Sequence, residues 1–585
     1  MADRTKPVIT FFKVANLECQ IQDLKFSKLG VVFSSKNTIK FISHAKFVSS
    51  ISPLLAAASS KQAPISGTKK VKSANSGVTF NEESNEGVSN SADYATQPPE
   101  QNNFTSSIPI KQSKIHSLTD SNPILLTKLD PVTLHTFSDN CTLNEIDFFD
   151  DSLVLYMTEI SKMKLLFLKI DDVLTLEQKG NPKTSESSSS VEKPSVTYAF
   201  PGSGKSSSSG IRFLGIDIPS TTNCGIVKPG ANVNSKQGKV RFHVNTPFEF
   251  EKTFDLEVDT GKVKLVEEIN LLGKKFESTN YEISLIYAPS VDGKQIPITL
   301  IHRKGMLNSD LLPRKVGQQR KLLLKTYGCY GMNNNIEFES SNWSLLERDW
   351  IIAYAHIRGG SELGKDWHQS ATKHDKHKST EDIIACCNFL VAEQFTHPSI
   401  LCATSNSGGA GILASAINLK PSIFKAVHLS VPFLDIRGSL MNPDLPLSQS
   451  DYHEFGNPLK DSKAYDSVSS ICPYTNLQSA EYPSLLITAF KDDYRTPLWN
   501  ILKYTARFRE VVQRPTRVKE YSEKNINVII DEGSHLGTND DASNMERTAI
   551  ITSFYEWIVE EMSTDVEKRA KKEYFSSFMN RFKGK

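Results

Sequence analysis

The pattern of hydrophobic and polar residues changes near residue 320. After that point, strand-length apolar runs alternate with helix-length amphipathic stretches. Six such runs are KLLLKTY, WIIAYAHI, SILCATS, AVHLSV, SLLITAF and NVIID. Alternating strands and helices predict a parallel sheet that is covered by helices on both faces.

Two further strands are predicted just before this region. The stretch EISLIYAPSVDGKQIPITLIHRKG, residues 282–305, contains two alternating runs that flank an Asp-Gly turn, and this is the pattern of a β-hairpin. The hairpin and the six later runs give eight strands in total. We therefore predict an α/β domain over residues 281–562 with an eight-stranded, mostly parallel sheet.

Residues 1–280 follow a different pattern. Short apolar, β-branched runs such as VVFSS, TIKFIS, SLVLYMT, KLLFLKI, KVRFHV and TFDLEV are separated by polar turns, which predicts an all-β domain. Residues 55–122 and 180–210 are rich in Ser and other small or polar residues without a hydrophobic period, so we expect disordered insertions there. The GSGK at residues 202–205 lacks the preceding strand and the spacing of a phosphate-binding loop.

Residues 563–585 form a basic tail with aromatic residues near helical spacing. Such a tail suits an anionic membrane surface or a partner protein. A frayed or locally packed terminal helix explains the same pattern, and we favour this second interpretation.

Composition limits the classes of function. The 585 residues include 68 Lys and Arg against 66 Asp and Glu, so the net charge of +2 gives no electrostatic footprint for nucleic acid. No secretory leader and no run of about 20 apolar residues is present, which predicts a cytosolic protein without a transmembrane segment. The eight cysteines lack the spacing and His partners of a zinc site, so we expect reduced thiols.

One serine has the surroundings of a nucleophile elbow. In SILCATSNSGGAGILASAI, Ser407 stands between a predicted strand and a predicted helix, with Gly408 and Gly409 after it. Small neighbours permit the sharp turn that exposes a serine at the carboxyl edge of a sheet. The amide of Gly408, near the helix N-terminus, is a candidate oxyanion donor. A helix N-cap serine is the structural alternative for Ser407.

A serine nucleophile requires a base and an acid, which follow in the order Ser, Asp, His in this fold class. Asp493 lies after the predicted strand SLLITAF, and His535 lies after NVIID. Both positions fall at the carboxyl ends of strands, where ligand sites of open α/β sheets lie. Asp492 competes with Asp493. Other histidines, such as those of the charged stretch KHDKHKS at residues 373–379, are expected on the surface.

Several motifs together resemble the prolyl oligopeptidase family. In chain order they are YGCYGMNNN, AHIRGGSELGKDWH, NSGGAG, VPFLDI, EFGNP, YPSLLITAFKDDYR and GSHLG, within residues 281–562. The resemblance implies a carboxyl-terminal α/β-hydrolase domain capped by an amino-terminal β-propeller. It also implies serine hydrolase chemistry without a metal or an organic cofactor.

The resemblance assigns roles to individual residues. The family's catalytic serine falls on Ser407, its DxR motif falls on Asp493 and Arg495, and its base falls on His535. The DxR match is the reason to prefer Asp493 over Asp492. Arg495 then holds a substrate carbonyl, and Tyr327 completes the oxyanion hole together with Gly408. A core aromatic at a strand end is the structural alternative for Tyr327.

The sequence departs from the family at the specificity pocket and at the elbow. Where a branch with basic-residue specificity has two acids, this chain has Asp451 and His453, so we expect weak binding of a substrate Arg or Lys. Ser405 replaces the usual first glycine of the elbow and is expected to distort the turn. Both departures lead us to expect low peptidase activity. The branch of the family that the chain resembles most is associated with esterase and thioesterase activity, so the resemblance implies that esters or thioesters are favoured over peptides as substrates.

The amino-terminal domain is the other departure. About 180 residues remain in 1–280 once the insertions are removed, enough for about four blades of 40–45 residues. We thus expect an incomplete or degenerate β-propeller-like domain, or a chain truncated at its amino end. An alternative function is a weakly active or inactive adaptor that binds a partner protein in vesicle trafficking at the Golgi.

Overall fold

The structure is a computed structural model that describes residues 21–26, 30–35, 38–43, 132–136, 141–149, 152–169, 197–199, 212–232, 238–258, 260–269, 278–308, 310–313, 319–513 and 526–560. Contacts along the chain separate it into two compact units. Residues 1–19 and 42–131 make one unit, and residues 20–41 and 132–585 make the other. All the sites discussed below lie within the second unit.

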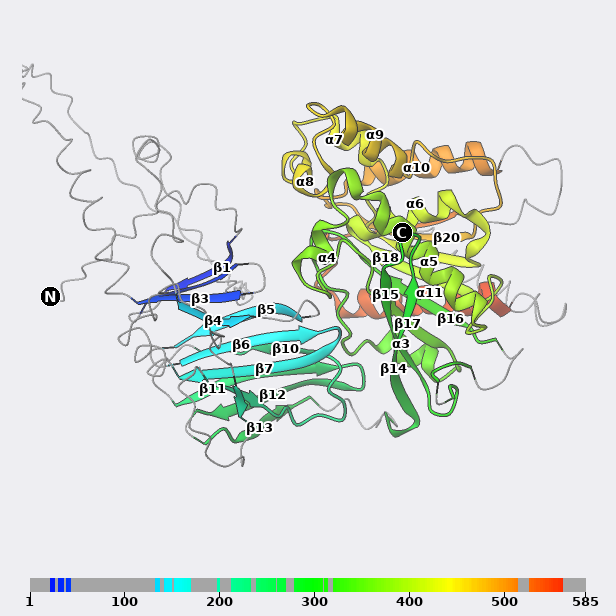
Figure 1. Ribbon diagram of the computed structural model, residues 1–585. Helices are drawn as coiled ribbons and strands as arrows, with labels where there is room; N and C mark the ends of the chain where they lie inside the picture. The colour runs from blue at the N-terminus through cyan, green and yellow to red at the C-terminus, as the bar shows by residue number, and fades with distance from the viewer. Residues whose placement is uncertain are drawn as a thin grey trace, which may run out of the picture. The chain divides into compact units, whose positions relative to one another are not determined.

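The amino-terminal part contains three small sheets (Figure 1). The first has the order β1-β2-β3-β4, with the strands Ile21–Phe26, Gly30–Ser35, Thr38–Ser43 and Val132–Thr136. The second has the order β5-β6-β7-β9-β8, with the strands Cys141–Phe148, Ser152–Glu159, Lys162–Lys169, Arg212–Ile216 and Thr197–Ala199. The third has the order β10-β11-β12-β13, with the strands Ile226–Pro229, Lys239–Thr246, Glu249–Glu257 and Val263–Glu268.

Strand pairing and burial confirm the predicted β character of this region. The pairs β1–β2, β3–β4, β5–β6, β6–β7, β7–β9, β10–β11, β11–β12 and β12–β13 are antiparallel, whereas β8 runs parallel to β9. Burial alternates along β11, and Phe242 of this strand pairs with Phe254 of β12, with ring centroids 5.6 Å apart. Both rings belong to a core built from the second and third sheets.

Parts of the predicted insertions and the tail cannot be compared with the structure. Residues 55–122, residues 563–585 and the GSGK at 202–205 lie outside the described residues. Within the stretch 180–210, residues 197–199 form β8, which corrects the expectation that the whole stretch lacks regular structure. The pairing of β8 with β9 gives its backbone partners that the sequence pattern does not reveal.

The predicted eight-stranded sheet is confirmed, with the order β14-β15-β17-β16-β18-β19-β20-β21. In chain order, its strands are β14 Tyr281–Pro289, β15 Gln295–Arg303, β16 Leu322–Thr326, β17 Ile351–Ala355, β18 Leu401–Asn406, β19 Ala426–Ser430, β20 Ser484–Phe490 and β21 Ile526–Asp531. The hairpin β14–β15 is antiparallel and β15 is antiparallel to β17, whereas β17 through β21 pair in parallel. Their carboxyl ends therefore share one edge.

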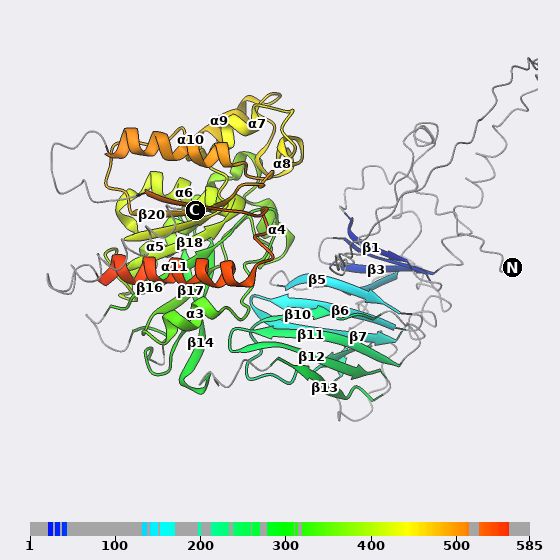
Figure 2. The same cartoon turned by 180° about the vertical axis from the view of Figure 1, so that it is seen from behind.

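Helices cover both faces of this sheet (Figure 2). They are α3 Ser340–Leu346, α4 Lys365–Gln369, α5 His377–Ala392, α6 Ser407–Leu419, α7 Ile436–Leu440, α8 Ser448–Phe455, α9 Ser462–Ile471, α10 Leu498–Phe508 and α11 Asp541–Glu560. Leu322 and Leu324 of β16 face the core under α5 and α6, whereas Leu323 faces the core under α3 and α11. Burial on both faces explains why these strands read as continuous apolar runs.

The cysteines within the described residues agree with the predicted reduced thiols. They are all free and buried: Cys141, Cys224, Cys329, Cys386, Cys387, Cys402 and Cys472. In the part of the chain that the structure describes, no helix combines the length and the apolar character needed to span a bilayer.

Candidate active site

Ser407 occupies a sharp turn between β18 and α6. Its φ of 51° lies in the left-handed region, where a non-glycine residue is strained. The two glycines that follow leave room for this turn. A Cβ on Gly408 would lie 2.8 Å from the Tyr330 ring, and a Cβ on Gly409 would lie 2.7 Å from the Tyr327 carbonyl oxygen. Both positions therefore require glycine, as an elbow does.

Ser405 fits this turn without distorting it. Its side chain is buried, and its hydroxyl donates a hydrogen bond of 2.6 Å to the carbonyl oxygen of Thr326. Its backbone keeps the parallel pairing with Leu429 of β19. The expected distortion at this position is therefore wrong, because the added hydroxyl finds an acceptor on the neighbouring strand.

His535 links the serine to the acid. Its Nε2 lies 2.9 Å from the Ser407 hydroxyl oxygen, and its Nδ1 lies 2.8 Å from Oδ2 of Asp493. A carboxylate can only accept from Nδ1–H, so Nε2 of the neutral ring is left free to accept the serine proton. The loop after β21 carries this histidine, and a β-bridge between Ser534 and Gly537 closes the loop.

Asp493 is buried and fully hydrogen-bonded. Its Oδ1 accepts from the amides of Arg495 and Thr496, both at 2.9 Å, and the Thr496 hydroxyl lies 2.8 Å from Oδ2. Burial raises the pKa of Asp493, but the hydrogen bonds from His535 and Thr496 outweigh it and hold the pKa below its usual 3.8. Asp492 is exposed, so the structure favours Asp493 as the orienting acid.

Tyr327 follows β16 and is buried beside the elbow. Burial raises the pKa of its phenol, although a hydrogen bond with the Ser407 side chain and the charge of Arg495 oppose the rise. The phenol therefore keeps its proton and can donate. Gly408 is the second residue of α6, so its amide is among the N–H groups that a helix N-terminus leaves unpaired. Both groups are hydrogen-bond donors next to Ser407, which makes them the candidate oxyanion donors.

Arg495 and Asp451 come from different segments of the chain, the loop after β20 and the helix α8. Arg495 is exposed, and its charge acts on the Tyr327 phenol. Asp451 lies on α8, and its carboxylate accepts a hydrogen bond of 3.2 Å from the Tyr330 hydroxyl. Burial raises the pKa of Asp451 to about 6, against the hydrogen bond from Tyr330. His453 of the same helix is exposed.

Sequence reasoning missed two residues of this site. Tyr330 has a φ of 58°, and its ring contacts Gly408 and packs edge-on against Phe455. Thr496 holds both Asp493 and the carbonyl oxygen of Val431. Their only signal in the sequence is their place in the YGCYG and DYRT stretches, since both contacts join segments that are far apart in the chain.

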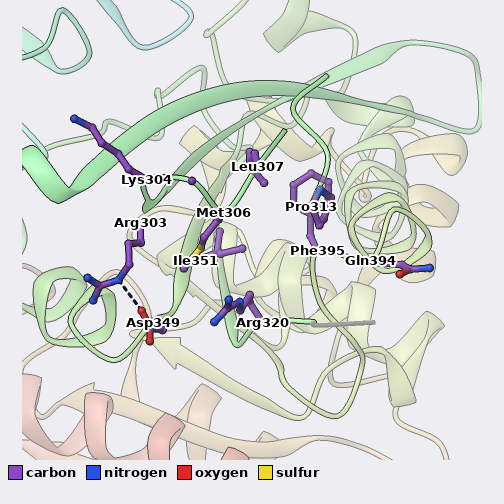
Figure 3. A pocket seen from close by; sticks show the side chains of 11 residues that line it. Arg303, Lys304, Met306, Leu307, Pro313, Arg320, Asp349, Ile351, Gln394 and Phe395 are labelled. Atoms are coloured by element: carbon purple, nitrogen blue, oxygen red, sulfur yellow. Dashed lines mark hydrogen bonds and ion pairs between the residues drawn. The ribbon is translucent and has the colours of Figure 1, made fainter. Parts of the chain in front are cut away.

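A cavity lies away from this site. It has a volume of about 430 Å³ and lies at the opposite edge of the sheet, where β15 ends and β16 and β17 begin (Figure 3). Arg303 at its rim is paired with Asp349 at 2.7 Å. Met306 and Ile351 give it an apolar floor. The chemistry of the triad therefore has no direct access to it.

Comparisons with known proteins agree with this geometry. Residues 336–562 match the prolyl oligopeptidase family. The chain is 34% identical over 296 residues to the prolyl endopeptidase-like protein of Macaca fascicularis, covering 48% of this chain and 39% of that protein. It is 36% identical over 282 residues to the prolyl endopeptidase-like protein of Gallus gallus, covering 47% and 37%.

A solved structure shows the same fold at low sequence identity. Oligopeptidase B from Leishmania major superposes with a TM-score of 0.60 at 21% identity, over 76% of this chain and 54% of that one. The alignments with the curated relatives span about two fifths of the length of those proteins. The match over residues 336–562 identifies this part of the chain as a prolyl oligopeptidase family domain, which supports a serine-type hydrolase.

Proposed function

We propose that the protein is a serine hydrolase that acts through an acyl-enzyme on short peptides, esters or thioesters. One observation carries this proposal. Ser407, His535 and Asp493 form a continuous hydrogen-bonded relay, with distances of 2.9 and 2.8 Å. Residues from three separate loops that meet in this order have the geometry of a catalytic triad.

In the proposed reaction, the Ser407 oxygen attacks the substrate carbonyl carbon while Nε2 of His535 takes the hydroxyl proton. The tetrahedral oxyanion accepts hydrogen bonds from the Tyr327 phenol and the Gly408 amide. His535 then returns its proton to the leaving amine, alcohol or thiol. In the second half, His535 takes a proton from water as the water oxygen attacks the acyl carbon. His535 then returns this proton to the Ser407 oxygen as the bond between the acyl carbon and Ser407 breaks, and the acid product leaves. Asp493 stabilises the imidazolium in both halves.

The surroundings of Asp451 support a preference for uncharged substrates. Its carboxylate is the acid tied to the Tyr330 hydroxyl, and burial, which raises its pKa to about 6, disfavours its charged form. A single carboxylate already engaged in this way binds a cationic side chain weakly. An ester or thioester with a neutral acyl group does not need a carboxylate partner in this pocket. This favours such substrates over peptides with Arg or Lys.

The amino-terminal sheets serve, in this proposal, as an incomplete or degenerate β-propeller-like cap. Support comes from the meander order of the first and third sheets and from contacts at the β6–β7 turn. There the Ser161 hydroxyl lies 3.1 Å from the Thr299 hydroxyl and 3.2 Å from Nε2 of His356. A cap anchored in this way limits the size of the substrate that reaches Ser407.

The adaptor alternative and the cytosolic location stay predictions. Adaptor binding does not require Ser407, His535 and Asp493 to be in hydrogen-bond contact, so the assembled relay favours hydrolysis over this alternative.

The test compares para-nitrophenyl esters, acyl thioesters and peptide anilides as substrates of the wild type and of Ser407→Ala. We expect turnover that depends on Ser407, with kcat/KM higher for the esters. Turnover that persists in Ser407→Ala would overturn the proposed nucleophile.

A further inference from the structure

A fully buried lysine lies under the candidate active site. The Nζ atom of Lys376 donates to the carbonyl oxygen of Gly328 at 2.8 Å and to Oε1 of Glu454 at 2.5 Å. Glu454 is itself 3% exposed, and its Oε2 lies 2.8 Å from Nε2 of His368. Lys376 belongs to the segment just before α5 and has no exposed surface at all.

A gain in folding stability does not by itself explain why this ion pair is buried. Removing two charges from water costs several kcal/mol per ion, and a well-packed apolar pair of similar volume is often as stable. The pair therefore suggests a geometric role, which depends on what its two ends hold.

Each end holds an element of the proposed catalytic centre. Gly328 directly follows Tyr327, the proposed oxyanion donor. Glu454 lies on α8, one turn after Asp451, whose carboxylate accepts from Tyr330. The pair thus joins the loop 327–330 to α8.

The backbone of this loop enters the left-handed region at two positions. Gly328 has a φ of 70°, and a Cβ there would lie 2.5 Å from the Ile357 side chain. Tyr330 also has a positive φ. The carbonyl of Gly328 is held by Nζ of Lys376, whereas the Ser379 hydroxyl, 3.4 Å away, donates to the Arg358 carbonyl oxygen at 2.8 Å. Strained segments persist where their surroundings over-determine them.

We infer that the buried Lys376–Glu454 pair is a positioning device that sets the Tyr327 phenol at oxyanion distance from Ser407. This inference rests on the proposed function, because it assigns a role within that same site. Neither residue touches the reacting atoms. Lys376 acts through the peptide group between residues 328 and 329, and Glu454 fixes Lys376 against α8.

The test measures kcat and KM on one neutral para-nitrophenyl ester for Lys376→Met in the full chain. A displacement of a catalytic group by about 1 Å can cost about 100-fold in rate. We expect kcat to fall about 10- to 100-fold while KM changes less than about twofold, since the acyl pocket stays in place. The matched control is His374→Asn, which breaks the exposed His374–Asp461 pair nearby and should leave both constants unchanged.

Lys376→Met leaves a buried carboxylate with one partner fewer, so the variant is also made as Lys376→Met/Glu454→Gln, which neutralises both ends. Thermal melts identify which of the two is folded, and the kinetic comparison uses that one. A folded variant with wild-type kcat would overturn the inference.

The same substitution in a Tyr327→Phe variant distinguishes a positioning role of Lys376 from a general destabilisation of the site. In Tyr327→Phe the proposed donor is absent, so Lys376→Met should lower kcat less than about twofold further. An equal fall in both backgrounds would show a merely structural role and overturn the inference. If the wild type itself shows no turnover that depends on Ser407, the proposed function fails, which is a distinguishable outcome.

Discussion

The hydroxyl of Ser405 donates a hydrogen bond of 2.6 Å to the carbonyl oxygen of Thr326. Thr326 ends β16 and directly precedes Tyr327, whereas Ser405 lies one residue before the end of β18. The residue that replaces a glycine of the elbow therefore ties the strand of the nucleophile to the strand of the oxyanion donor.

Replacing Ser405 with Gly should not raise activity. The variant loses a buried hydrogen bond and gains backbone freedom, so we expect the free energy of unfolding to fall by about 1–2 kcal/mol, with kcat/KM within about twofold of wild type. Urea denaturation and ester hydrolysis measure the two quantities. A tenfold gain in kcat/KM would mean that Ser405 does distort the elbow.

Replacing Gly409 with Ala should disrupt the elbow. The new Cβ would lie 2.7 Å from the Tyr327 carbonyl oxygen and from the Ser405 hydroxyl oxygen, so Tyr327 must move. We expect ester turnover to fall at least about tenfold. Ser415→Ala, a small change on the same helix, is the control and should retain full turnover. An unaffected Gly409→Ala would contradict the tight fit at the elbow.

Replacing Tyr327 with Phe removes a phenol proton beside Ser407. Loss of one oxyanion donor typically costs about 100- to 1,000-fold in kcat, and we expect a fall of this size with little change in KM. The control is Tyr504→Phe, since the buried Tyr504 hydroxyl has no hydrogen-bond partner among the described residues. A fall below threefold in Tyr327→Phe would assign the oxyanion to other donors.

Asp451 should make substrate choice depend on pH. Its pKa is raised to about 6, so the carboxyl is neutral below that pH and negative above it. The ratio of kcat/KM for a substrate with Lys to one with norleucine at the same position should thus rise about three- to tenfold from pH 5 to pH 7. Groups such as His535 change kcat/KM of both substrates equally when they titrate, so their effect drops out of this ratio. In Asp451→Asn it should be flat, and a persisting rise would place the titrating group elsewhere.

The sequence alone was sufficient for the sheet, and it singled out Ser407, Asp493 and His535, which the structure brings into hydrogen-bond contact. Each of these features follows from local order, because an apolar strand is succeeded by a loop that carries the reactive side chain. Lys376 shows what local order does not reveal. It stands between His374 and His377, whose side chains are about half exposed, yet it is fully buried.

The burial of Lys376 depends on Glu454, which is 78 residues away in the chain. The tie between Tyr330 and Asp451 spans 121 residues. No periodicity or spacing reports such contacts, since they arise only when α8 packs beside the loop 327–330. The number of blades in the amino-terminal domain likewise depends on how the sheets associate. The pattern of predicted strands does not contain this information.

The most direct test of the proposed function is labelling of the full chain by a fluorescent fluorophosphonate. The reagent phosphonylates an activated serine, so we expect rapid labelling of the wild type, none of Ser407→Ala, and rates at least about 100-fold lower in Asp493→Asn and His535→Ala. A folded wild-type protein that is not labelled, or a Ser407→Ala variant that is labelled at the wild-type rate, would contradict the assignment of Ser407 as the nucleophile.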